Sequence, residues 1–345
     1  NSTLVYRGGQ VRNRYDVIII GAGPAGIACA QALAGSSLSV LLLEKNEAIG
    51  PKVCAGGLTR MAAQFGVPGD RIRSFREQVV CLDGRSPFRI VLSHPMITVN
   101  RVDLARHHLA GIEGASNVEI SVGTRVTRIS DSAVWTDQGV FPFRFLVGAD
   151  GSQSIVRKHL GLPSRFGVGL YYEVPRRSDE VRFHFKPGIV RSGYLWAFPH
   201  RDCTNVGIGF NPDRLTAGLA KVVLRQFVKE LGFAADGARL RGGTISHLYR
   251  GCRFGNLCLA GDAAGLASMA SGEGIPFALV SGREIGRAIL DPGYPMPEFR
   301  RMLALKRRQE GYWGFFESVP RLHRTLLTAY FTMMKRPWMQ AYMGY

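Results

Sequence analysis

Three glycines near the start of the chain have the spacing of a phosphate-binding turn. Gly21, Gly23 and Gly26 form a G-x-G-x-x-G sequence directly after the apolar run at 15–20 and before the small-residue segment at 27–35. The first glycine permits a tight turn, the second lets the backbone approach a pyrophosphate, and the third lets a helix pack close to a strand. A helix that begins here directs free N–H groups at the phosphates. The motif predicts a bound dinucleotide.

Glu44 supplies the acidic residue that this fingerprint requires about 20 residues further along. It ends a second apolar run, LSVLLLE at 38–44. A carboxylate at this strand end accepts hydrogen bonds from ribose hydroxyls and repels a 2′-phosphate. Because the strands, the helix and the acid all stand in the required order, the dinucleotide prediction does not depend on the glycines alone.

Three later segments indicate which dinucleotide is bound. FLVGADG at 145–151 and LCLAGDAAG at 257–265 are apolar strands that end in Gly and Asp, and Arg101 stands at the start of a helical segment at 100–109. Each segment alone is typical of an ordinary turn. Four such motifs in order along most of the chain favour a cofactor site.

These four segments resemble those of the FAD-dependent p-hydroxybenzoate hydroxylase superfamily, which carries them in the same order. The resemblance implies non-covalent FAD, with Asp262 at its ribityl chain and Arg101 also at the cofactor. It implies that the segment around Asp150 braces the FAD site and is associated with a nicotinamide donor. No second complete glycine motif follows a strand, since those at 167–169 and 207–209 lack the third glycine and the helix. A reductant is therefore expected to visit the flavin transiently.

Three further segments resemble one branch of that superfamily, the prenyl (geranylgeranyl) reductases. They are PKVCAGGLT at 51–59, the Tyr-x-Trp-x-Phe-Pro sequence at 194–199 and SGEGIPFALVSG at 271–282. The resemblance covers the chain to about residue 290. It implies hydride transfer from reduced flavin to a C=C bond of a geranylgeranyl or polyprenyl group, with protonation of the other carbon. NADPH or a ferredoxin-type protein is the implied electron donor, and no metal is expected.

The resemblance also implies a set of site residues. Cys54, Tyr194 and Trp196 are the predicted catalytic residues, and the predicted substrate-binding residues are Tyr194, Trp196, Phe198 and Pro199. The predicted cofactor-binding residues are Gly21, Gly23, Pro24, Ala25, Gly26, Glu44, Lys45, Cys54, Ala55, Gly56, Gly57, Arg101, Val126, Ala149, Asp150, Gly151, Gly261, Asp262, Gly272, Gly274 and Ile275.

The chemistry of an isolated alkene explains why aromatic residues suit this role. No carbonyl accepts the charge, so hydride and proton addition pass through cationic character that aromatic faces stabilise. Cys54 is a thiol in the flavin loop that donates or relays the proton, or else a small buried filler between glycines. Ser271 and Glu273 are further candidates, although Glu273 could instead cap the helix that follows. The aromatic residues themselves could equally be ordinary core.

A second function remains open at this stage. Flavin-dependent halogenases carry a W-x-W-x-I-P motif in a similar place, whereas this chain has Tyr194, Trp196, Phe198 and Pro199. The alternative is therefore a flavin-dependent monooxygenase or halogenase that acts on an aromatic or lipid substrate. A flavin-binding protein without catalytic activity is a third interpretation.

The positions of the motifs predict a mixed α/β fold. A discontinuous, Rossmann-like FAD-binding domain is expected at 11–75, 100–164 and 246–295. A smaller antiparallel-sheet substrate domain at 76–99 and 165–245 interrupts it, with alternating strands at 181–185 and 194–198 and a helix at 219–232. Residues 296–345 form a helical C-terminal segment. The antiparallel sheet is expected to roof the flavin ring.

The net charge limits the class of partner to be expected, and the cysteine content limits the cellular compartment. Lys and Arg number 44 against 26 Asp and Glu, a net charge of +18, which favours a prenyl diphosphate or an anionic membrane. No nucleic-acid motif is present. The basic, aromatic-rich segment 296–345 consists either of helices packed on the sheet or of an amphipathic surface that lies on a membrane or covers a lipid tunnel. With no C-x-x-C pair, signal peptide or spanning run, a cytoplasmic protein, either free or peripheral to the membrane, is expected. The oligomeric state is not indicated.

Overall fold

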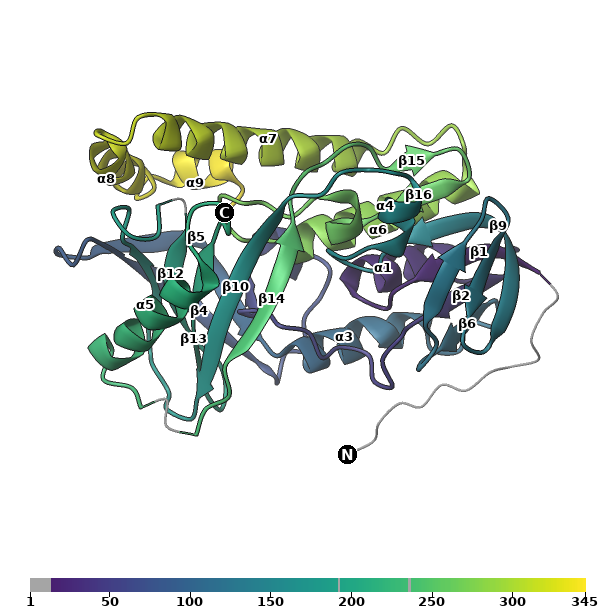
Figure 1. Cartoon of the computed structure of the whole chain (residues 1–345), viewed down its shortest axis with the longest axis horizontal. Coiled ribbons are helices and arrows are strands. Elements are labelled where there is room, and N and C mark those ends of the chain that lie inside the picture. Colours follow the sequence, from purple (N-terminus) through teal and green to yellow (C-terminus); the bar gives the residue numbers. More distant parts are fainter. Residues whose placement is uncertain (1–13, 192, 235–236) are drawn as a thin grey trace.

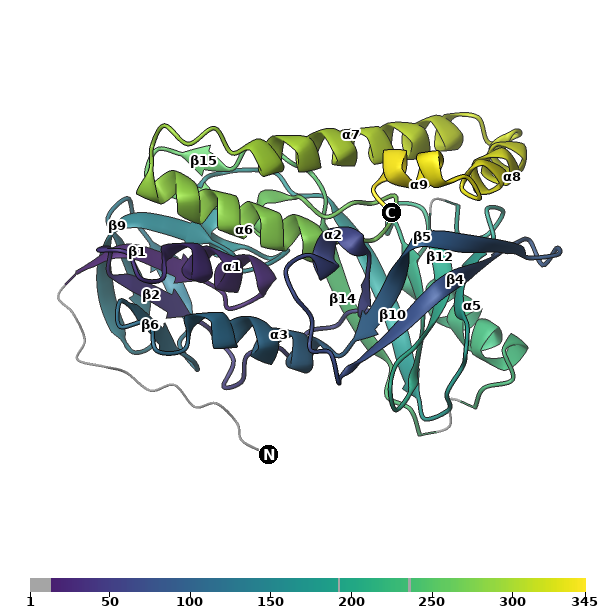
Figure 2. The same ribbon diagram turned by 180° about the vertical axis from the view of Figure 1, so that it is seen from behind.

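Two β-sheets lie beside each other and helices cover them (Figure 1). The computed structural model describes residues 14–191, 193–234 and 237–345. Residues 11–13 of the predicted FAD-binding domain, and residues 192, 235 and 236 of the predicted substrate domain, lie outside this part. Helices near the C-terminal end of the chain run across both sheets, on the same edge in both views (Figures 1 and 2).

The first sheet is the Rossmann-like half of the molecule. Its strand order is β15-β16-β9-β1-β2-β6, and β7 and β8 attach through β9. The pairs β16–β9, β9–β1, β1–β2 and β2–β6 are parallel, so helices cover the sheet and its central strands are apolar along their length. The strands of this sheet are β1 (Tyr15–Ile20), β2 (Val40–Leu43), β6 (Val118–Ser121), β7 (Val126–Ile129), β8 (Ala133–Thr136), β9 (Gly139–Gly148), β15 (Arg253–Phe254) and β16 (Leu257–Leu259).

Helices α1 (Pro24–Leu33) and α6 (Ile275–Leu290) pack together in close contact beside this sheet. A Cβ atom at Gly282 would lie 2.0 Å from the Ala25 oxygen, and one at Gly286 would lie 2.9 Å from the Cys29 oxygen. Only glycine permits such contact between the two backbones. The packing holds the first turn of α6 close to the glycine-rich turn before α1. The remaining helices on this half are α2 (Arg60–Ala63), α3 (Arg101–Leu109), α4 (Ile155–His159) and the 3₁₀ segments η1 (Ala110–Ile112) and η2 (Gly261–Ala264).

The second sheet is antiparallel except for one pair. Its order is β14-β10-β13-β12-β11-β4-β5-β3, and only β11–β4 is parallel among its described pairs. Its strands are β3 (Gly57–Leu58), β4 (Ile72–Leu82), β5 (Phe88–Val99), β10 (Phe166–Val174), β11 (Val181–Phe185), β12 (Tyr194–Pro199), β13 (Thr204–Phe210) and β14 (Arg241–Ser246). The sheet thus also recruits residues before position 76, and it has eight strands, like the first.

The two faces of β12 pack against different helices, as the two-residue period of a strand requires. Leu195 and Ala197 pack in the cluster that includes Leu224 and Phe227 of α5 (Ala217–Glu230). Their neighbour Trp196 belongs to the opposite cluster, which includes the C-terminal helices. The predicted strands at 181–185 and 194–198 are confirmed. The predicted helix at 219–232 is confirmed two residues earlier, because Thr216 caps its start and the chain turns at Gly232 with φ +68°.

The C-terminal segment forms α7 (Pro297–Ser318), α8 (His323–Met333) and α9 (Pro337–Met343). Two buried residues of α7 hold the loop that precedes α6: Lys306 Nζ donates to the Ala267 oxygen at 2.8 Å, and Ser268 Oγ donates to Gln309 Oε1 at 3.0 Å. Gln309 Nε2 also donates to the Met343 oxygen at the end of α9. In the described part of the chain, no helix combines the length and hydrophobicity needed to cross a bilayer.

Candidate cofactor and substrate site

Two adjoining cavities lie where the parallel strands end. The first, of about 430 Å³, is bounded by the glycine-rich turn and the end of β2. The second, of about 220 Å³, extends under the second sheet. The residues that line both are Gly23, Pro24, Lys52, Arg101, Ala149 and Gly151. The shared walls mean that one elongated ligand can reach from one cavity to the other.

The three glycines of the turn have different geometries. Gly21 has φ +101°, and a Cβ atom there would lie 2.5 Å from the Ala149 oxygen. A Cβ atom at Gly26 would lie 1.9 Å from the Gly21 oxygen, whereas Gly23 has nothing within 4 Å. Gly21 and Gly26 therefore let the turn close, and Gly23 leaves its backbone open to a ligand. No described side chain caps the start of α1, so the backbone of its first turn is left open to a ligand.

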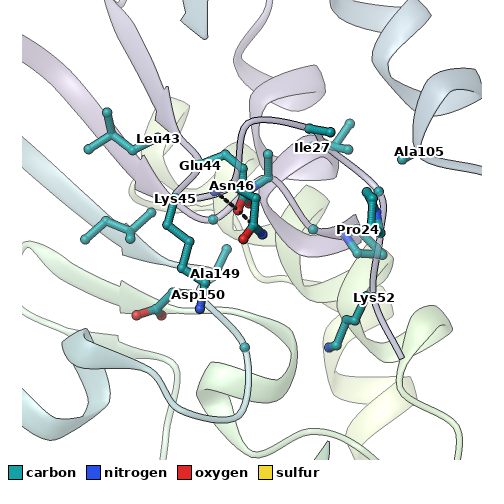
Figure 3. Close-up of a pocket in the computed structure, with 18 of the residues that line it drawn as sticks. Pro24, Ile27, Leu43, Glu44, Lys45, Asn46, Lys52, Ala105, Ala149 and Asp150 are labelled. Atoms are coloured by element: carbon teal, nitrogen blue, oxygen red, sulfur yellow. Dashed lines mark hydrogen bonds between the residues drawn. The ribbon is translucent and has the colours of Figure 1, made fainter. Parts of the chain in front are cut away.

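Glu44 organises the wall beside this turn (Figure 3). Its Oε2 accepts a hydrogen bond from the Ala22 N–H at 3.0 Å, and its Oε1 accepts from the side-chain amide of Asn46 at 2.7 Å. Each carboxylate oxygen can accept more than one bond, so the group that orders the loop still has acceptor capacity toward the cavity. Contact of Glu44 with a ribose stays a prediction.

Polar atoms without partners also line this region. Asp150 Oδ2 accepts from the Ile155 N–H at 2.7 Å, but its Oδ1 is buried without a partner among the described residues, as is the Nε of Arg101. Burial raises the pKa of Asp150. Buried polar groups are normally hydrogen-bonded. The unsatisfied atoms, the open Gly23 backbone and the free helix start fit a dinucleotide that carries hydroxyl and phosphate groups.

The segment at the junction of the cavities contains Asp262, whose Oδ2 lies 3.2 Å from Lys52 Nζ. Its position depends on Arg157, which is fully buried and donates to the backbone oxygens of Ala263 at 3.1 Å and Leu248 at 2.6 Å. Burial lowers the pKa of Arg157. The Arg157 side chain thus braces the turn that presents Asp262.

An aromatic wall closes the second cavity. We use this name for Tyr194, Trp196 and Phe198, which share one face of β12, together with Phe183 of β11. Neighbouring ring centroids lie 5.1 to 6.3 Å apart. The same rings pack against buried residues of the C-terminal helices. Core and pocket are therefore not exclusive, because these rings form a core whose inner surface is the cavity.

Glycines on β13, beside β12, and on β10, the next strand of the sheet, make room for the Trp196 indole. A Cβ atom at Gly207 would lie 2.2 Å from Trp196 Cζ2, and those at Gly169 and Gly209 would lie 3.7 and 3.6 Å from the ring. Three glycines of the pairs at 167–169 and 207–209 thus pack against a large ring, whereas Gly167 lies against Met269.

Hydrogen bonds fix the wall to the loops on either side. The Tyr194 hydroxyl donates to the Ser271 oxygen at 2.6 Å. Trp196 Nε1 donates to Asn205 Oδ1 at 2.8 Å, and Asn205 Nδ2 donates to the Cys54 oxygen at 3.3 Å. One strand therefore positions both glycine-containing loops of the second cavity.

Cys54 is half-buried and lines the second cavity. Its Sγ accepts a hydrogen bond from the Gly56 N–H at 3.3 Å, and its side chain packs at the edge of a small apolar cluster. The thiol thus both packs among neighbours and faces the cavity.

The structure brings the predicted site residues together, with two exceptions. All except Gly26 and Pro199 line one of the two cavities. Gly26 lies behind the turn, and Pro199 is buried in β12 with its oxygen accepting from Thr98. The cavity residues that sequence reasoning missed include Lys52, Thr59, Tyr171, Phe183, Met269 and Tyr345. Lys52 and Thr59 stand in the segment that carries the resemblance, whereas no local pattern signals that Tyr345 reaches the cavity.

Comparisons with known proteins agree with this arrangement. Residues 19–54 match the model of the NAD(P)-binding Rossmann-like domain. The chain is 30% identical to an uncharacterized protein of Methanosarcina barkeri, over 86% of this chain and 79% of the relative. It is 28% identical to digeranylgeranylglycerophospholipid reductase 1 of Methanopyrus kandleri, over 80% of each chain. It is also 28% identical to the geranylgeranyl diphosphate reductase of Rhodobacter capsulatus, over 82% of this chain and 77% of that enzyme.

Solved structures share the fold. A geranylgeranyl bacteriochlorophyll reductase-like protein from Thermoplasma acidophilum superposes with a TM-score of 0.78 at 21% identity, over 94% of this chain and 92% of that one. The p-nitrophenol 4-monooxygenase of Pseudomonas putida has a TM-score of 0.71 at 15% identity, over 96% and 97%. At these identities the likeness concerns the fold alone.

Proposed function

Because the chain belongs to the geranylgeranyl (prenyl) reductase family of FAD-dependent oxidoreductases, we propose that it saturates C=C bonds of a geranylgeranyl or other polyprenyl group. The observation that carries this proposal is the aromatic wall, which lines an apolar cavity beside the glycine-containing loops. Such a wall excludes water and accommodates a hydrocarbon chain. It offers no charged side chain of its own to a polar substrate.

In this proposal FAD occupies both cavities. The turn at Gly21 and Gly23 and the start of α1 would hold its pyrophosphate, Glu44 a ribose, and Asp262 the ribityl chain. When bound in its reduced form, the flavin supplies a hydride to the alkene. NADPH or a ferredoxin-type protein would restore the reduced state.

The residues of the wall act on the substrate. The faces of Tyr194 and Trp196 stabilise positive charge that develops on the alkene carbons, an effect of about 2 kcal/mol or more at a desolvated site. The second carbon needs a proton from a group in the cavity. Cys54 is one such group, since this residue lines the cavity.

The rival function is oxygenation or halogenation, which the same fold supports in other proteins. In that case the reduced flavin would react with oxygen, and an aromatic or lipid substrate would gain oxygen or halogen. The resemblance of the Cys54 loop to that of prenyl reductases favours alkene reduction instead.

The C-terminal helices would bring the enzyme to lipid. Residues 318–345 contain no Asp or Glu but include Arg321, Arg324, Lys335 and Arg336. Trp338, 62% exposed, follows two of these residues, and Val91 of neighbouring β5 is 68% exposed. Of these basic residues Arg324 lies 3.6 Å from Asp83, and exposed apolar side chains among the others suit an anionic bilayer. We infer peripheral contact with such a surface, and the substrate is then a prenyl lipid or prenyl diphosphate.

One experiment separates the alternatives. The FAD-loaded protein is photoreduced without oxygen and mixed with geranylgeranyl diphosphate or a digeranylgeranyl phospholipid. Reoxidation of the flavin, with two hydrogen atoms gained by the lipid for each double bond reduced, supports the reductase. Stable reduced flavin without oxygen, followed by oxygenated or halogenated product once oxygen and halide are added, would replace it with the rival function.

A further inference from the structure

Glu273 is a carboxylate of the second cavity that has no ion-pair partner among the described residues. It stands in the loop 268–274, directly before α6, and lines the cavity. The backbone fixes its position, because the Ser268 N–H donates to the Glu273 oxygen and the Gly272 N–H to the Ser268 oxygen, both at 2.9 Å. Lys306 and Gln309 of α7 form hydrogen bonds with Ala267 and Ser268, where this loop begins.

Glu273 is half-buried, and one of its carboxylate oxygens is shielded from solvent. Its Oε1 has no hydrogen-bond partner in the described part of the chain, and no described Lys or Arg pairs with it. The other cavity carboxylate, Asp262, has Lys52 as its partner. Capping of α6 does not account for Glu273 either, since Gly274 is the capping residue and no side-chain cap bond is present. A buried polar atom left unsatisfied costs about 1 to 3 kcal/mol, which implies a role other than stability.

Hydroxyl groups surround this carboxyl. Tyr194, Tyr330 and Tyr345 lie close enough for a charge on Glu273 to raise the pKa of each, after the larger effect of burial. For Glu273 itself, burial raises the pKa more than the nearby Thr59 and Ser271 hydroxyls lower it. The surroundings therefore favour the neutral carboxylic acid, the form that can give up a proton.

We propose that Glu273 is the acid that protonates the alkene, an inference that rests on the proposed prenyl reduction. The π electrons of the double bond take the Glu273 proton at one carbon, so that a C–H bond forms and the O–H bond breaks. The other carbon accepts a hydride from the reduced flavin, which is thereby oxidised by two electrons. The carboxylate then regains a proton from water.

Acid strength favours Glu273 over Cys54 in this step. A carboxyl group is by its chemistry a stronger acid than a thiol, and burial reduces but does not reverse this order for a carboxyl that keeps hydroxyl neighbours. An unactivated alkene is a very weak base, so it needs the stronger acid. Cys54 Sγ accepts a hydrogen bond from the Gly56 N–H and packs against apolar neighbours, so we assign the thiol a packing role.

The test compares Glu273→Gln, which keeps the shape but not the acid, with Glu273→Asp, which keeps the acid. The first readout is the infrared carbonyl band of a protonated carboxylic acid, followed against pH in oxidised protein without substrate. This band should be present in the wild type and lost in Glu273→Gln. The second is anaerobic reoxidation of the reduced flavin by geranylgeranyl diphosphate. Glu273→Gln should slow this step about 10²- to 10⁴-fold, with flavin content unchanged.

The pH profile gives a further readout. In the wild type, the rate should fall as the pH rises through the pKa of Glu273, and Glu273→Asp should keep part of the rate while shifting the profile. Two outcomes overturn the inference: an equal rate in Glu273→Gln, or no loss of the carbonyl band. If Glu273→Gln fails to hold flavin, the inference is overturned when the pH profile of the rate in Glu273→Asp is not shifted from that of the wild type. A wild type that reduces no prenyl group would instead contradict the proposed function, whatever the infrared band shows.

Discussion

The Tyr194 hydroxyl donates a 2.6 Å hydrogen bond to the backbone oxygen of Ser271, so the aromatic wall and the loop before α6 are held as one unit. Two positions further along β12, Trp196 reaches the Cys54 loop through Asn205. The strand that presents the proposed substrate surface also positions both loops of the second cavity. Changes on β12 can therefore act on substrate, on cofactor, or on both, and the predictions below separate these effects.

Trp196→Phe should lower turnover of long prenyl chains while leaving FAD content close to that of the wild type. The ring that lines the cavity becomes smaller and the bond to Asn205 is lost, at about 0.5 to 1.5 kcal/mol. Trp196→Ala should show a larger loss of turnover, which grows with chain length. Flavin absorbance per protein and kcat/KM for C10, C15 and C20 diphosphates measure this. If the Trp196→Ala variant loses both its flavin and its native fold, the ring serves only as core.

Cys54→Ser should retain FAD and change the anaerobic reoxidation rate by less than about tenfold. The hydroxyl keeps the size and the acceptor for the Gly56 N–H, and in our proposal the proton comes from Glu273. Stopped-flow absorbance of the flavin with geranylgeranyl diphosphate measures the rate. A decrease in this rate as large as that of Glu273→Gln would identify the Cys54 thiol as the proton donor instead.

Gly207→Ala should impair both stability and activity, because its Cβ would lie 2.2 Å from the Trp196 ring. Either the indole moves into the cavity or the strands separate, at about 1 to 3 kcal/mol. Gly218→Ala is the matched control, since nothing lies within 4 Å of its Cβ position on α5. The midpoint of thermal unfolding and the KM for the prenyl substrate report the two effects. Equal unfolding midpoints and equal KM values in the two variants would show that the Trp196 ring leaves enough space for the added methyl group.

Acid should destabilise the fold, because burial lowers the pKa of His108, His184 and His247 to about 4. The unfolded chain binds protons on these groups near their ordinary pKa of about 6.5. The stability they contribute is thus present above about pH 6.5 and is lost as the pH falls toward 4. Urea unfolding across this range should show the decline, and His184→Phe, which keeps a ring against Phe227, should reduce it. A free energy of unfolding that stays constant across this pH range would contradict the lowered pKa values of these histidines.

Trp338→Ser should weaken binding to vesicles that contain phosphatidylglycerol, and Lys335→Gln with Arg336→Gln should weaken it further. The first change removes an exposed ring and the second removes charge worth about 1 kcal/mol per residue. Leu219→Ser, on exposed α5, is the control and should bind as the wild type does. Sedimentation with anionic and with neutral vesicles measures the difference. Equal loss in the control, or no preference for anionic lipid, would exclude this face.

Much of this site could be predicted because its cofactor half is local in sequence. The turn from Gly21 to Gly26 and the acid at Glu44 lie within one strand–helix–strand unit, where spacing alone determines geometry. The alternation around Trp196 likewise predicted which rings share a face.

The rest depends on contacts that no local pattern records. Tyr345 reaches the cavity only because α7 to α9 fold back over the second sheet. The role of Arg157 depends on the carbonyl groups of Ala263 and Leu248, which distant segments bring to it. The sequence leaves Glu273 either as a site residue or as a helix cap, and only the structure shows that Gly274 holds the capping position.

The hydrogen bonds between α7 and the start of the loop before α6 have a thermodynamic consequence. Through Lys306 and Gln309, the helices that we place at the bilayer and the loop that we place at the flavin share one set of buried bonds. If lipid contact steadies these helices, it must strengthen cofactor retention by some factor, and cofactor binding must then strengthen lipid contact by the same factor. Shortening the C-terminal helices would accordingly cost the protein its flavin as well as its hold on substrate.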